Sequence, residues 1–209
     1  EITATLVKKL REMTDAGMME WKKALVEVNG DIEKAIEYLR EKGLSKAAKK
    51  ADRVAAEGAI ALKVDNDLTK VSMVEINSET DFVAKNDNFK ELCTKTLDIV
   101  SSSNINSIED LNSVVVDGAS FSDYLKSQIA KIGENIVVRR FINIKSNGNV
   151  ITNGYLHSNS KVGTIISLSF NNAESRAKLV EFSKNLCMHA AAMKPQIISY
   201  DEFSDDFIK

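Results

Sequence analysis

The sequence EINSETDFVAK, which spans Glu75–Lys85, has the pattern of a strand end, a polar turn and an aromatic residue beside an acid. The segment 87–100 behind it repeats apolar residues at helical spacing, so we expect a rigid helix after the turn. From these residues alone, Phe82 either folds back into the core or stays exposed for a partner. The fold around this turn therefore bears directly on function.

Further strands are predicted on both sides of this turn. Segments 59–64 and 70–76 flank a hairpin signal at 65–67. Three more segments have strand patterns: 136–144, 150–156 and 162–170. Two more helices are expected: one after Ser120, which can form a capping box with Asp123, and one over 173–193. Because neighbouring strands are joined by short turns, they pair antiparallel, and the predicted class is α+β rather than doubly wound α/β.

The amino-terminal part of the chain has the pattern of three short helices. In each of them, apolar residues share one face: Leu6, Val7, Leu10 and Met13; Met18, Trp21, Leu25 and Val28; Ile32, Ala35, Ile36 and Leu39. Asn29-Gly30 separates the second helix from the third, and Gly43 is predicted to end the third. We therefore expect a small amino-terminal bundle of about 40 residues.

A basic segment, Ser45–Ala56, follows this bundle. Lys46, Lys49, Lys50 and Arg53 stand at i, i+3, i+4 and i+7, so a helix there would carry one cationic stripe. The stripe is either the solvated face of a linker helix or a contact for an acidic protein surface. The predicted domains are a three-helix domain over 1–44, a basic linker helix over 45–56, a first core subdomain over 57–145, and a second, incomplete core subdomain over 146–209.

The composition is that of an ordinary globular protein. Hydrophobic residues make up 44% and charged residues 28% of the 209 residues. No apolar run approaches about 20 residues and no export leader is evident, so we expect neither a membrane location nor secretion. Cys93 and Cys187 fall at apolar helical positions and are expected to be reduced thiols in the cytoplasm. A net charge of −2 does not favour general nucleic-acid binding.

Catalytic residues are not evident in the sequence. A nucleophile needs a base within reach, and the two His residues are His157, in a loop pattern, and His189, in a helical run. A surface role is expected for the first and a packing or capping role for the second. The sequence contains neither a glycine-rich phosphate loop nor a metal-ligand spacing. We therefore expect no cofactor, no metal and no bond chemistry.

Two long segments are similar to the signatures of a known family. Leu10–Leu25 resembles the first signature of the translation elongation factor Ts family, and Glu75–Lys85 resembles the second, centred on Thr-Asp-Phe-Val-Ala. Three shorter segments fit the family in the same order: Ser45–Gly58, Ile132–Asn135 and His157–Gly163. The resemblance covers nearly the whole chain. It implies a guanine-nucleotide exchange factor that binds the GTPase elongation factor Tu and acts by binding alone.

The resemblance also implies which residues contact elongation factor Tu. Phe82 would act as a wedge beside the magnesium and phosphate region of the GTPase, with Asp81 close to the same place. The amino-terminal bundle would hold the nucleotide-binding domain, and His157 would touch a different domain of the partner. Ile132 and Gly133 match positions near the wedge. The complete set of expected contacts is Met18, Met19, Lys22, Lys50, Thr80, Asp81, Phe82, Val83, Ile132, Gly133 and His157.

Some features depart from the family or leave alternatives open. Met18 either contacts the partner or packs in the core, because it shares a stripe with Trp21 and Leu25, whereas Met19 faces a different side. Trp21 stands where the family usually has a smaller residue, which puts the local packing in question. Family members continue past Lys209 into a helical hairpin and the remainder of the second core half. The chain is therefore either a fragment or a short form, and its oligomeric state is open.

Two other classes of function compete with nucleotide exchange. Asn29–Leu39 is similar to the last helix of a ubiquitin-associated (UBA) domain, so the bundle is predicted to be UBA-like. An adaptor that recognises ubiquitin or a nascent chain is therefore the main alternative. The Asp81–Phe82 signature argues against it, because an adaptor has no need of the second domain. A nucleic-acid binder using the stripe from Lys46 to Arg53 would show a steep salt dependence, and we expect no direct nucleic-acid contact.

Overall fold

The computed structural model describes Thr5, Lys8 and residues 16–202 of the chain. The chain divides into two compact units. Unit 1 comprises Glu1–Gly58, Ile76–Leu92 and Ile105–Arg139, and unit 2 comprises Ala59–Glu75, Cys93–Asn104 and Arg140–Lys209. The apolar residues of the first predicted helix, Leu6, Val7, Leu10 and Met13, and the tail after 202 lie outside the described residues. The mixture of helices and antiparallel strands confirms the predicted α+β class.

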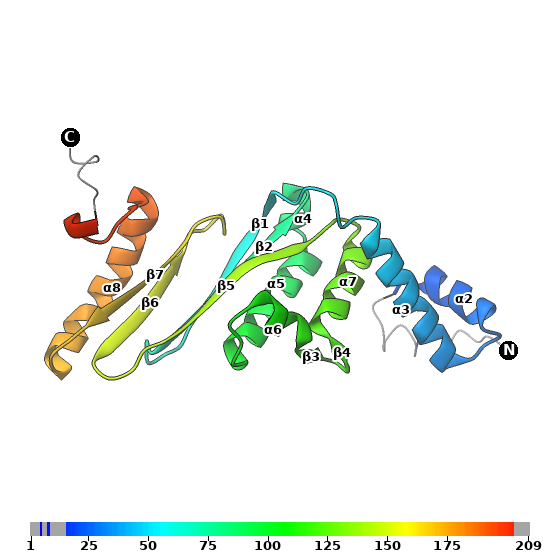
Figure 1. The fold of residues 1–209 in the computed structure, drawn as a ribbon, viewed down its shortest axis with the longest axis horizontal. Helices are drawn as coiled ribbons and strands as arrows, with labels where there is room; N and C mark the ends of the chain where they lie inside the picture. Colours follow the sequence, from blue (N-terminus) through cyan, green and yellow to red (C-terminus); the bar gives the residue numbers. More distant parts are fainter. Residues whose placement is uncertain (1–4, 6–7, 9–15, 203–209) are drawn as a thin grey trace. The chain divides into compact units, whose positions relative to one another are not determined.

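Unit 1 contains a helical hairpin made of α2 (Met18–Glu27) and α3 (Ile32–Ala48), which lie side by side (Figure 1). The predicted break between them is confirmed, because Asn29 and Gly30 adopt positive φ angles of 56° and 84°. The Asp31 carboxylate caps α3 by accepting a hydrogen bond from the Lys34 N–H at 3.1 Å. The hairpin core consists of these fully buried residues: Trp21, Ala24, Leu25 and Ala35.

The predicted end of α3 at Gly43 is wrong, because the helix continues to Ala48. Gly43 has no positive φ. A Cβ atom added there would lie 3.8 Å from the Ala130 Cβ of α7 (Phe121–Ile132), so the glycine faces a neighbouring helix. Packing between α3 and α7 stabilises the helical conformation beyond Gly43, although glycine often ends helices. The predicted basic helix over 45–56 is therefore not a separate element, since residues 49–53 form turns.

The rest of unit 1 includes the segment that follows β2 and several short elements. Its further elements are α4 (Asp81–Ala84), the first part of α5 (Asp87–Ser102), α6 (Ile108–Ser113), β3 (Val115–Val116), β4 (Ala119–Ser120) and α7. Strands β3 and β4 pair antiparallel. Ser120 caps α7 as predicted, by accepting from the Asp123 N–H at 3.1 Å. A reciprocal capping box instead forms at α6, between Ser107 and Asp110.

A three-stranded sheet has the order β1-β2-β5, and its strands contribute residues to both units. The strands are β1 (Glu57–Val64), β2 (Lys70–Ser78) and β5 (Val137–Lys145). Gly58, the second residue of β1, has a φ of +138°. A Cβ atom at this position would lie 2.1 Å from the carbonyl oxygen of Ile76, so the two backbones approach as closely as they do only because residue 58 is glycine.

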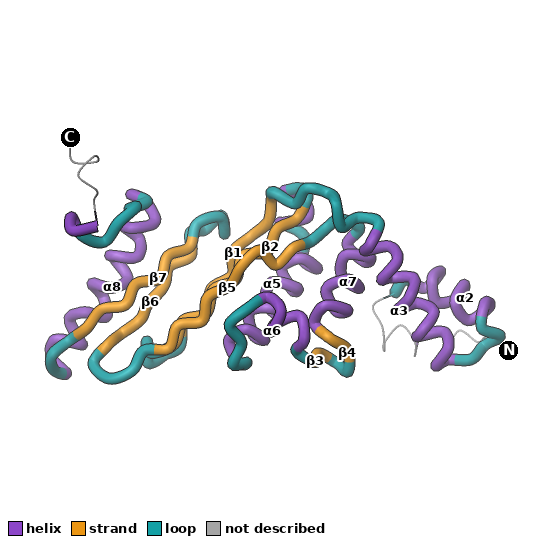
Figure 2. Tube along the Cα trace, viewed as in Figure 1, coloured by secondary structure: helices purple, strands orange, loops and turns teal. Residues whose placement is uncertain are grey.

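Unit 2 contains an antiparallel pair of strands, β6 (Val150–Leu156) and β7 (Gly163–Ser169), packed against α8 (Ala173–Met193) (Figures 1 and 2). A short 3-10 helix, η1 (Tyr200–Glu202), follows. The buried Asn153 side chain donates to the Ser183 hydroxyl of α8 at 3.0 Å. Helix α8 ends before Pro195, as predicted. None of the helices in the described part of the chain combines the length and apolar character that a bilayer crossing requires.

Candidate functional site

Phe82 lies on the four-residue helix α4, which begins after a two-residue turn at the end of strand β2, and the residue is 81% exposed. Thr80 caps α4, because its hydroxyl oxygen accepts a hydrogen bond from the Val83 N–H at 3.3 Å. Ala84 is buried and closes the inner side of the turn. Of the two alternatives left open by the residues alone, exposure of Phe82 is therefore the correct one.

The carboxylate of Glu134 holds the turn that precedes α4. Its Oε2 atom accepts hydrogen bonds from the backbone N–H groups of Glu79 and Thr80, each at 3.0 Å. Its Oε1 atom accepts a third hydrogen bond, from the Thr80 hydroxyl, at 2.7 Å. Hydrogen bonds to a carboxylate are shorter and stronger than those between neutral groups. One side chain therefore fixes two backbone groups and one hydroxyl of the turn.

A second set of hydrogen bonds runs between the same segments in the opposite direction. The Glu79 carboxylate accepts from the Asn135 N–H at 2.6 Å, and Nη1 of Arg53 lies 3.6 Å from the same oxygen. The Asn135 side chain is 4% exposed and donates to the carbonyl oxygens of Ala51 and Arg53 at 3.2 Å and 2.8 Å. Segments 51–53, 79–80 and 134–135 therefore meet in one polar cluster, which we call the junction.

Ile132 and Gly133, expected near the wedge, lie at the end of α7 immediately before the junction. Gly133 adopts a left-handed conformation with φ 92°, and its N–H donates to the Ile129 carbonyl at 2.9 Å. This conformation ends the helix and turns the chain toward residues 79–80. The structure thus brings Ile132 and Gly133 together with the turn that carries Phe82.

Asp81 and Lys85 form an ion pair on the surface of α4, with 2.9 Å between Oδ2 and Nζ. The two side chains are 48% and 76% exposed. Exposed pairs of this kind contribute at most about 1 kcal/mol. A partner could therefore replace Lys85 as the counter-charge of Asp81 at little cost in stability.

The exposed face of α2 carries the three contact residues predicted in the amino-terminal bundle. Met18 is 58% exposed and Met19 is 76% exposed, and Lys22 is exposed as well. The alternative that Met18 belongs to the core is wrong, because Ala24 and Leu25 fill the interior beside Trp21. Trp21, whose packing was in question, is fully buried in the core of the hairpin, where its indole nitrogen has no hydrogen-bond partner among the described residues.

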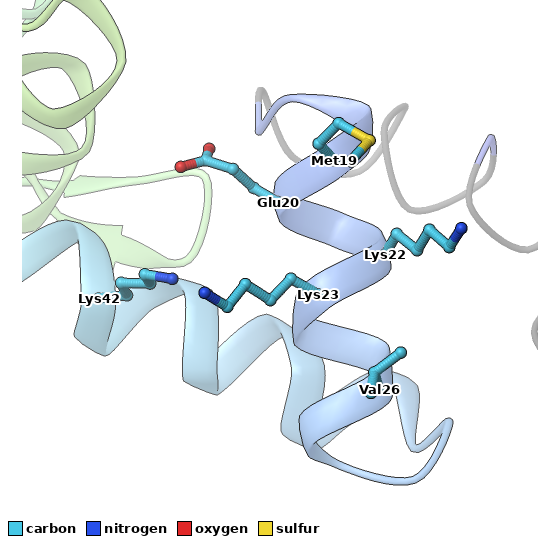
Figure 3. A pocket seen from close by; sticks show the side chains of 6 residues that line it. All are labelled: Met19, Glu20, Lys22, Lys23, Val26 and Lys42. Atoms are coloured by element: carbon cyan, nitrogen blue, oxygen red, sulfur yellow. The ribbon is translucent and has the colours of Figure 1, made fainter.

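A shallow hollow lies along this face and combines apolar and cationic side chains: Met19, Glu20, Lys22, Lys23, Val26 and Lys42 (Figure 3). Lys22 and Val26 project away from α3, whereas Glu20 and Lys23 project toward it (Figure 3). The hydrogen bond from Lys46 lowers the pKa of the Glu20 carboxyl below its ordinary value. The hollow therefore offers apolar contact bordered by positive charge.

The predicted cationic stripe is interrupted in the structure. Lys46 pairs with Glu20 and Arg53 pairs with Glu79, so two of the four charges have acidic partners within unit 1. Lys50 is half-buried in the turn after α3, where its N–H donates to the Ala47 carbonyl at 2.9 Å. These observations weaken the nucleic-acid alternative, because paired cations release fewer counterions on binding phosphates.

His157 lies in unit 2, in the exposed loop 157–162 between β6 and β7. Its Nδ1 atom is 2.9 Å from the Tyr155 hydroxyl. Its N–H donates to the Val162 carbonyl at 2.9 Å, which closes the loop. The imidazole is therefore presented on a surface turn of unit 2.

Within the described part of the chain, no group of three or more His, Cys, Asp or Glu side chains could hold a metal ion. Burial raises the pKa of the Cys93 thiol to about 12 and raises the pKa of the Cys187 thiol as well. Because the thiolate is the reactive form, both side chains act as small core residues at neutral pH.

Sequence reasoning missed the residues that support the turn, above all Glu79, Glu134 and Asn135. The only local indication in the sequence was Gly133, a glycine suited to end a helix, followed directly by Glu134 and Asn135. Such a sequence does not reveal its partners, because the hydrogen bonds join segments more than fifty positions apart. The structure alone identifies the junction.

Comparison with known proteins identifies a family and several relatives. The family model described as Elongation factor TS matches residues 79–209. The chain is 61% identical over 208 residues to Elongation factor Ts of Wolinella succinogenes, and 57% identical over 209 residues to that of Helicobacter hepaticus. It is 58% identical over 208 residues to Elongation factor Ts of Helicobacter pylori. Each comparison covers 100% of this chain but 59% of the relative, so the chain spans little more than half the length of these curated proteins.

Proposed function

Because this chain belongs to the elongation factor Ts family, we propose that it is a guanine-nucleotide exchange factor for elongation factor Tu in translation elongation. The observation that carries the proposal is the exposed Phe82 on a turn held by the junction. An aromatic side chain that is exposed and yet held in place is suited to enter another protein. We place the protein in the cytoplasm, where its partner would act.

In the proposed mechanism, Phe82 enters the GTPase beside its magnesium and phosphate region and displaces elements that hold the metal. Asp81 exchanges its surface pair with Lys85 for contacts near the same place, with Thr80 and Val83 flanking it. Burying one Phe side chain supplies about 1.5–3 kcal/mol. Since 1.4 kcal/mol is a factor of ten, Phe82 alone accounts for about a hundredfold weakening of nucleotide binding at most.

A larger effect requires a second area of contact. The exposed face of α2, with Met18, Met19 and Lys22, is proposed to hold the nucleotide-binding domain of the partner. Its two Met side chains adapt to an apolar surface, and its lysines favour an acidic rim. Further contacts are assigned to Lys50, Ile132, Gly133 and, on another domain of the partner, His157.

The domain organisation that accompanies this mechanism has four parts. We propose a UBA-like bundle over 1–44 as the docking arm, a basic connecting segment over 45–56 whose first four residues complete α3, and core subdomains over 57–145 and 146–209. No bond chemistry is required, because the factor acts by binding the nucleotide-free GTPase better than the loaded one. A factor with equal affinity for both states would change nothing.

Thermodynamic linkage provides the test of this function. The affinity of the purified chain for elongation factor Tu is measured with and without bound GDP, and the affinity for GDP is measured with and without the chain. We expect tighter binding to the nucleotide-free partner and a weakening of GDP binding by the same factor. Equal affinity for the two forms of the partner would disprove nucleotide exchange.

An adaptor function is the second candidate, and the exposed Met18, Met19 and Val26 on a helical hairpin favour it. Met19→Ala separates the two functions. As an exchange factor, the variant needs a higher concentration to release GDP from elongation factor Tu. If the protein is an adaptor, the variant loses binding to ubiquitin or a nascent peptide, and neither the wild type nor the variant releases GDP from elongation factor Tu.

A further inference from the structure

We infer that Glu134 is a positioning residue, which sets the direction in which Phe82 leaves the surface. The inference rests on the proposed exchange function and adds to it a residue that does not itself touch the partner. It follows from three features of unit 1: the shortness of α4, the hydrogen bonds of one carboxylate, and the anchoring of that carboxylate by its own neighbours.

Helix α4 cannot fix the orientation of Phe82 by itself. It contains four residues, Asp81–Ala84, and a single helical turn is unstable in isolation because its nucleation is unfavourable. The cap from Thr80 to Val83 is one hydrogen bond of 3.3 Å. The other backbone hydrogen bonds of α4 join only residues 80–86 to one another, so the direction of the 81% exposed Phe82 also depends on what holds residues 79 and 80.

Glu134 meets that requirement because both of its oxygens are engaged on the turn. One oxygen accepts two backbone N–H groups, and the other accepts the Thr80 hydroxyl. Glutamine has one carbonyl oxygen and could keep only part of this set, and alanine keeps none. The arrangement therefore predicts a graded series from Glu to Gln to Ala at position 134.

The neighbours of Glu134 hold its backbone in turn. Gly133, which precedes Glu134, ends α7 in a left-handed conformation, and the two residues that follow Glu134, Asn135 and Ile136, are 4% and 2% exposed. The Asn135 side chain is bonded to the carbonyl oxygens of Ala51 and Arg53, just beyond α3. The segment that holds the Phe82 turn is thus itself hydrogen-bonded to residues 51–53, which follow α3 of the proposed docking hairpin.

The test measures GDP release from elongation factor Tu across a range of factor concentrations. For Glu134→Ala, we expect the maximum release rate to fall about tenfold, the size expected for losing a hydrogen-bonded charged group. Glu134→Gln should lie between this variant and the wild type. The half-saturating concentration should change little, because the α2 face is intact. In a Phe82→Ala background, Glu134→Ala should cause no further loss.

Asp110→Ala is the matched control. Asp110 is also an acid of unit 1 that accepts two backbone N–H groups, from Asn106 and Ser107 at 3.0 Å and 3.1 Å, but it supports α6. We expect this variant to lose stability without lowering the maximum release rate. Equal losses in the Asp110 and Glu134 variants would overturn the inference, and so would an unchanged maximum rate in Glu134→Ala.

Hydrogen exchange separates a failure of this inference from a failure of the proposed function. The Glu79 and Thr80 amides should exchange faster in Glu134→Ala than in the wild type, whether or not the partner is present. If the wild type does not release GDP, the proposed exchange function is wrong. The hydrogen-exchange rates of the Glu79 and Thr80 amides then still show whether Glu134 orders the turn. Unchanged protection of both amides would overturn the positioning role.

Discussion

Two exposed turns carry side chains that are proposed to contact the partner, Phe82 in unit 1 and His157 in unit 2, and they are held in different ways. The Phe82 turn depends on Glu134, which lies more than fifty positions away in the sequence. The His157 loop is closed mainly by its own backbone, through His157 N–H to Val162 O at 2.9 Å and Ser160 N–H to His157 O at 2.8 Å. One further bond, from the Ile60 N–H to the Ser160 carbonyl, joins this loop to β1.

The difference in support indicates that the two turns have different roles, one as a wedge and the other as an additional contact. A wedge must keep its direction while it meets resistance, so it requires support from outside its own segment. A loop that adds contact area can adjust to its partner and needs less support. We therefore expect substitutions that disturb the support to matter more at the Phe82 turn than at the His157 loop.

The largest effect on stability is expected from a pair of glycine substitutions. Gly58→Ala places a Cβ atom 2.1 Å from the carbonyl oxygen of Ile76, which belongs to β2, the strand that leads to Phe82. Gly163→Ala, at the end of the His157 loop, places it 2.7 Å from the Met73 Sδ atom, which can move. We expect costs of about 3 kcal/mol and about 1 kcal/mol respectively, measured by urea unfolding. Equal costs would contradict the contrast between rigid and adaptable support.

A smaller difference is expected between two hydrogen-bonding side chains of the turns. Thr80→Val removes the helix cap and the hydrogen bond to Glu134, and should cost about 1–2 kcal/mol. Asn159→Ala removes an exposed bond to the Lys161 N–H in the His157 loop and should cost less than about 0.5 kcal/mol. Denaturant midpoints of both variants check this order. A larger loss for Asn159→Ala would reverse the comparison.

The smallest effect is expected at His157 itself. His157→Ala should raise the half-saturating concentration for GDP release by about two- to threefold, because one rim contact is worth well under 1 kcal/mol. The maximum release rate should stay at the wild-type value. Tyr155→Phe, which removes only the hydroxyl beside the imidazole, is the matched control and should change neither quantity. A fall in the maximum rate would give His157 a role in displacing the nucleotide.

The sequence was sufficient to predict the elements whose signals are local. The break at Asn29-Gly30, the Ser120 cap and the end of α8 before Pro195 are each determined by residues within a few positions. The strand pattern likewise predicted the antiparallel pairing of β6 with β7, but the pairing expected between β5 and β6 is wrong, because β5 belongs to the sheet β1-β2-β5. Where the predictions are confirmed, local propensity and tertiary packing favour the same structure.

The errors occurred where packing between distant segments overrides local preference. Gly43 was predicted to end a helix, but its contact side faces Ala130 of α7 and the helix continues. The stripe from Lys46 to Arg53 was interpreted as one surface, but two of its charges pair with Glu20 and Glu79. Periodicity cannot reveal such partners, because they are set by the tertiary fold.

The exposed ring of Phe82 was recognised only through the family resemblance, since its own segment left exposure and burial equally open. The junction was not recognised at all. Its residues belong to three separate segments, and each is ordinary in its local context. The physical information that defines the site is therefore the proximity of 51–53, 79–80 and 134–135, which composition and spacing do not contain.

The most direct measurement is the maximum rate of GDP release from elongation factor Tu at saturating concentrations of wild type and Phe82→Ala. We expect the variant to stay folded and still bind, but to release GDP more slowly, by up to about a hundredfold. Val115→Ala is the matched control, because Val115 is also an apolar residue of unit 1 and is 75% exposed. It should match the wild type. A Phe82→Ala variant that reaches the wild-type maximum would contradict the account.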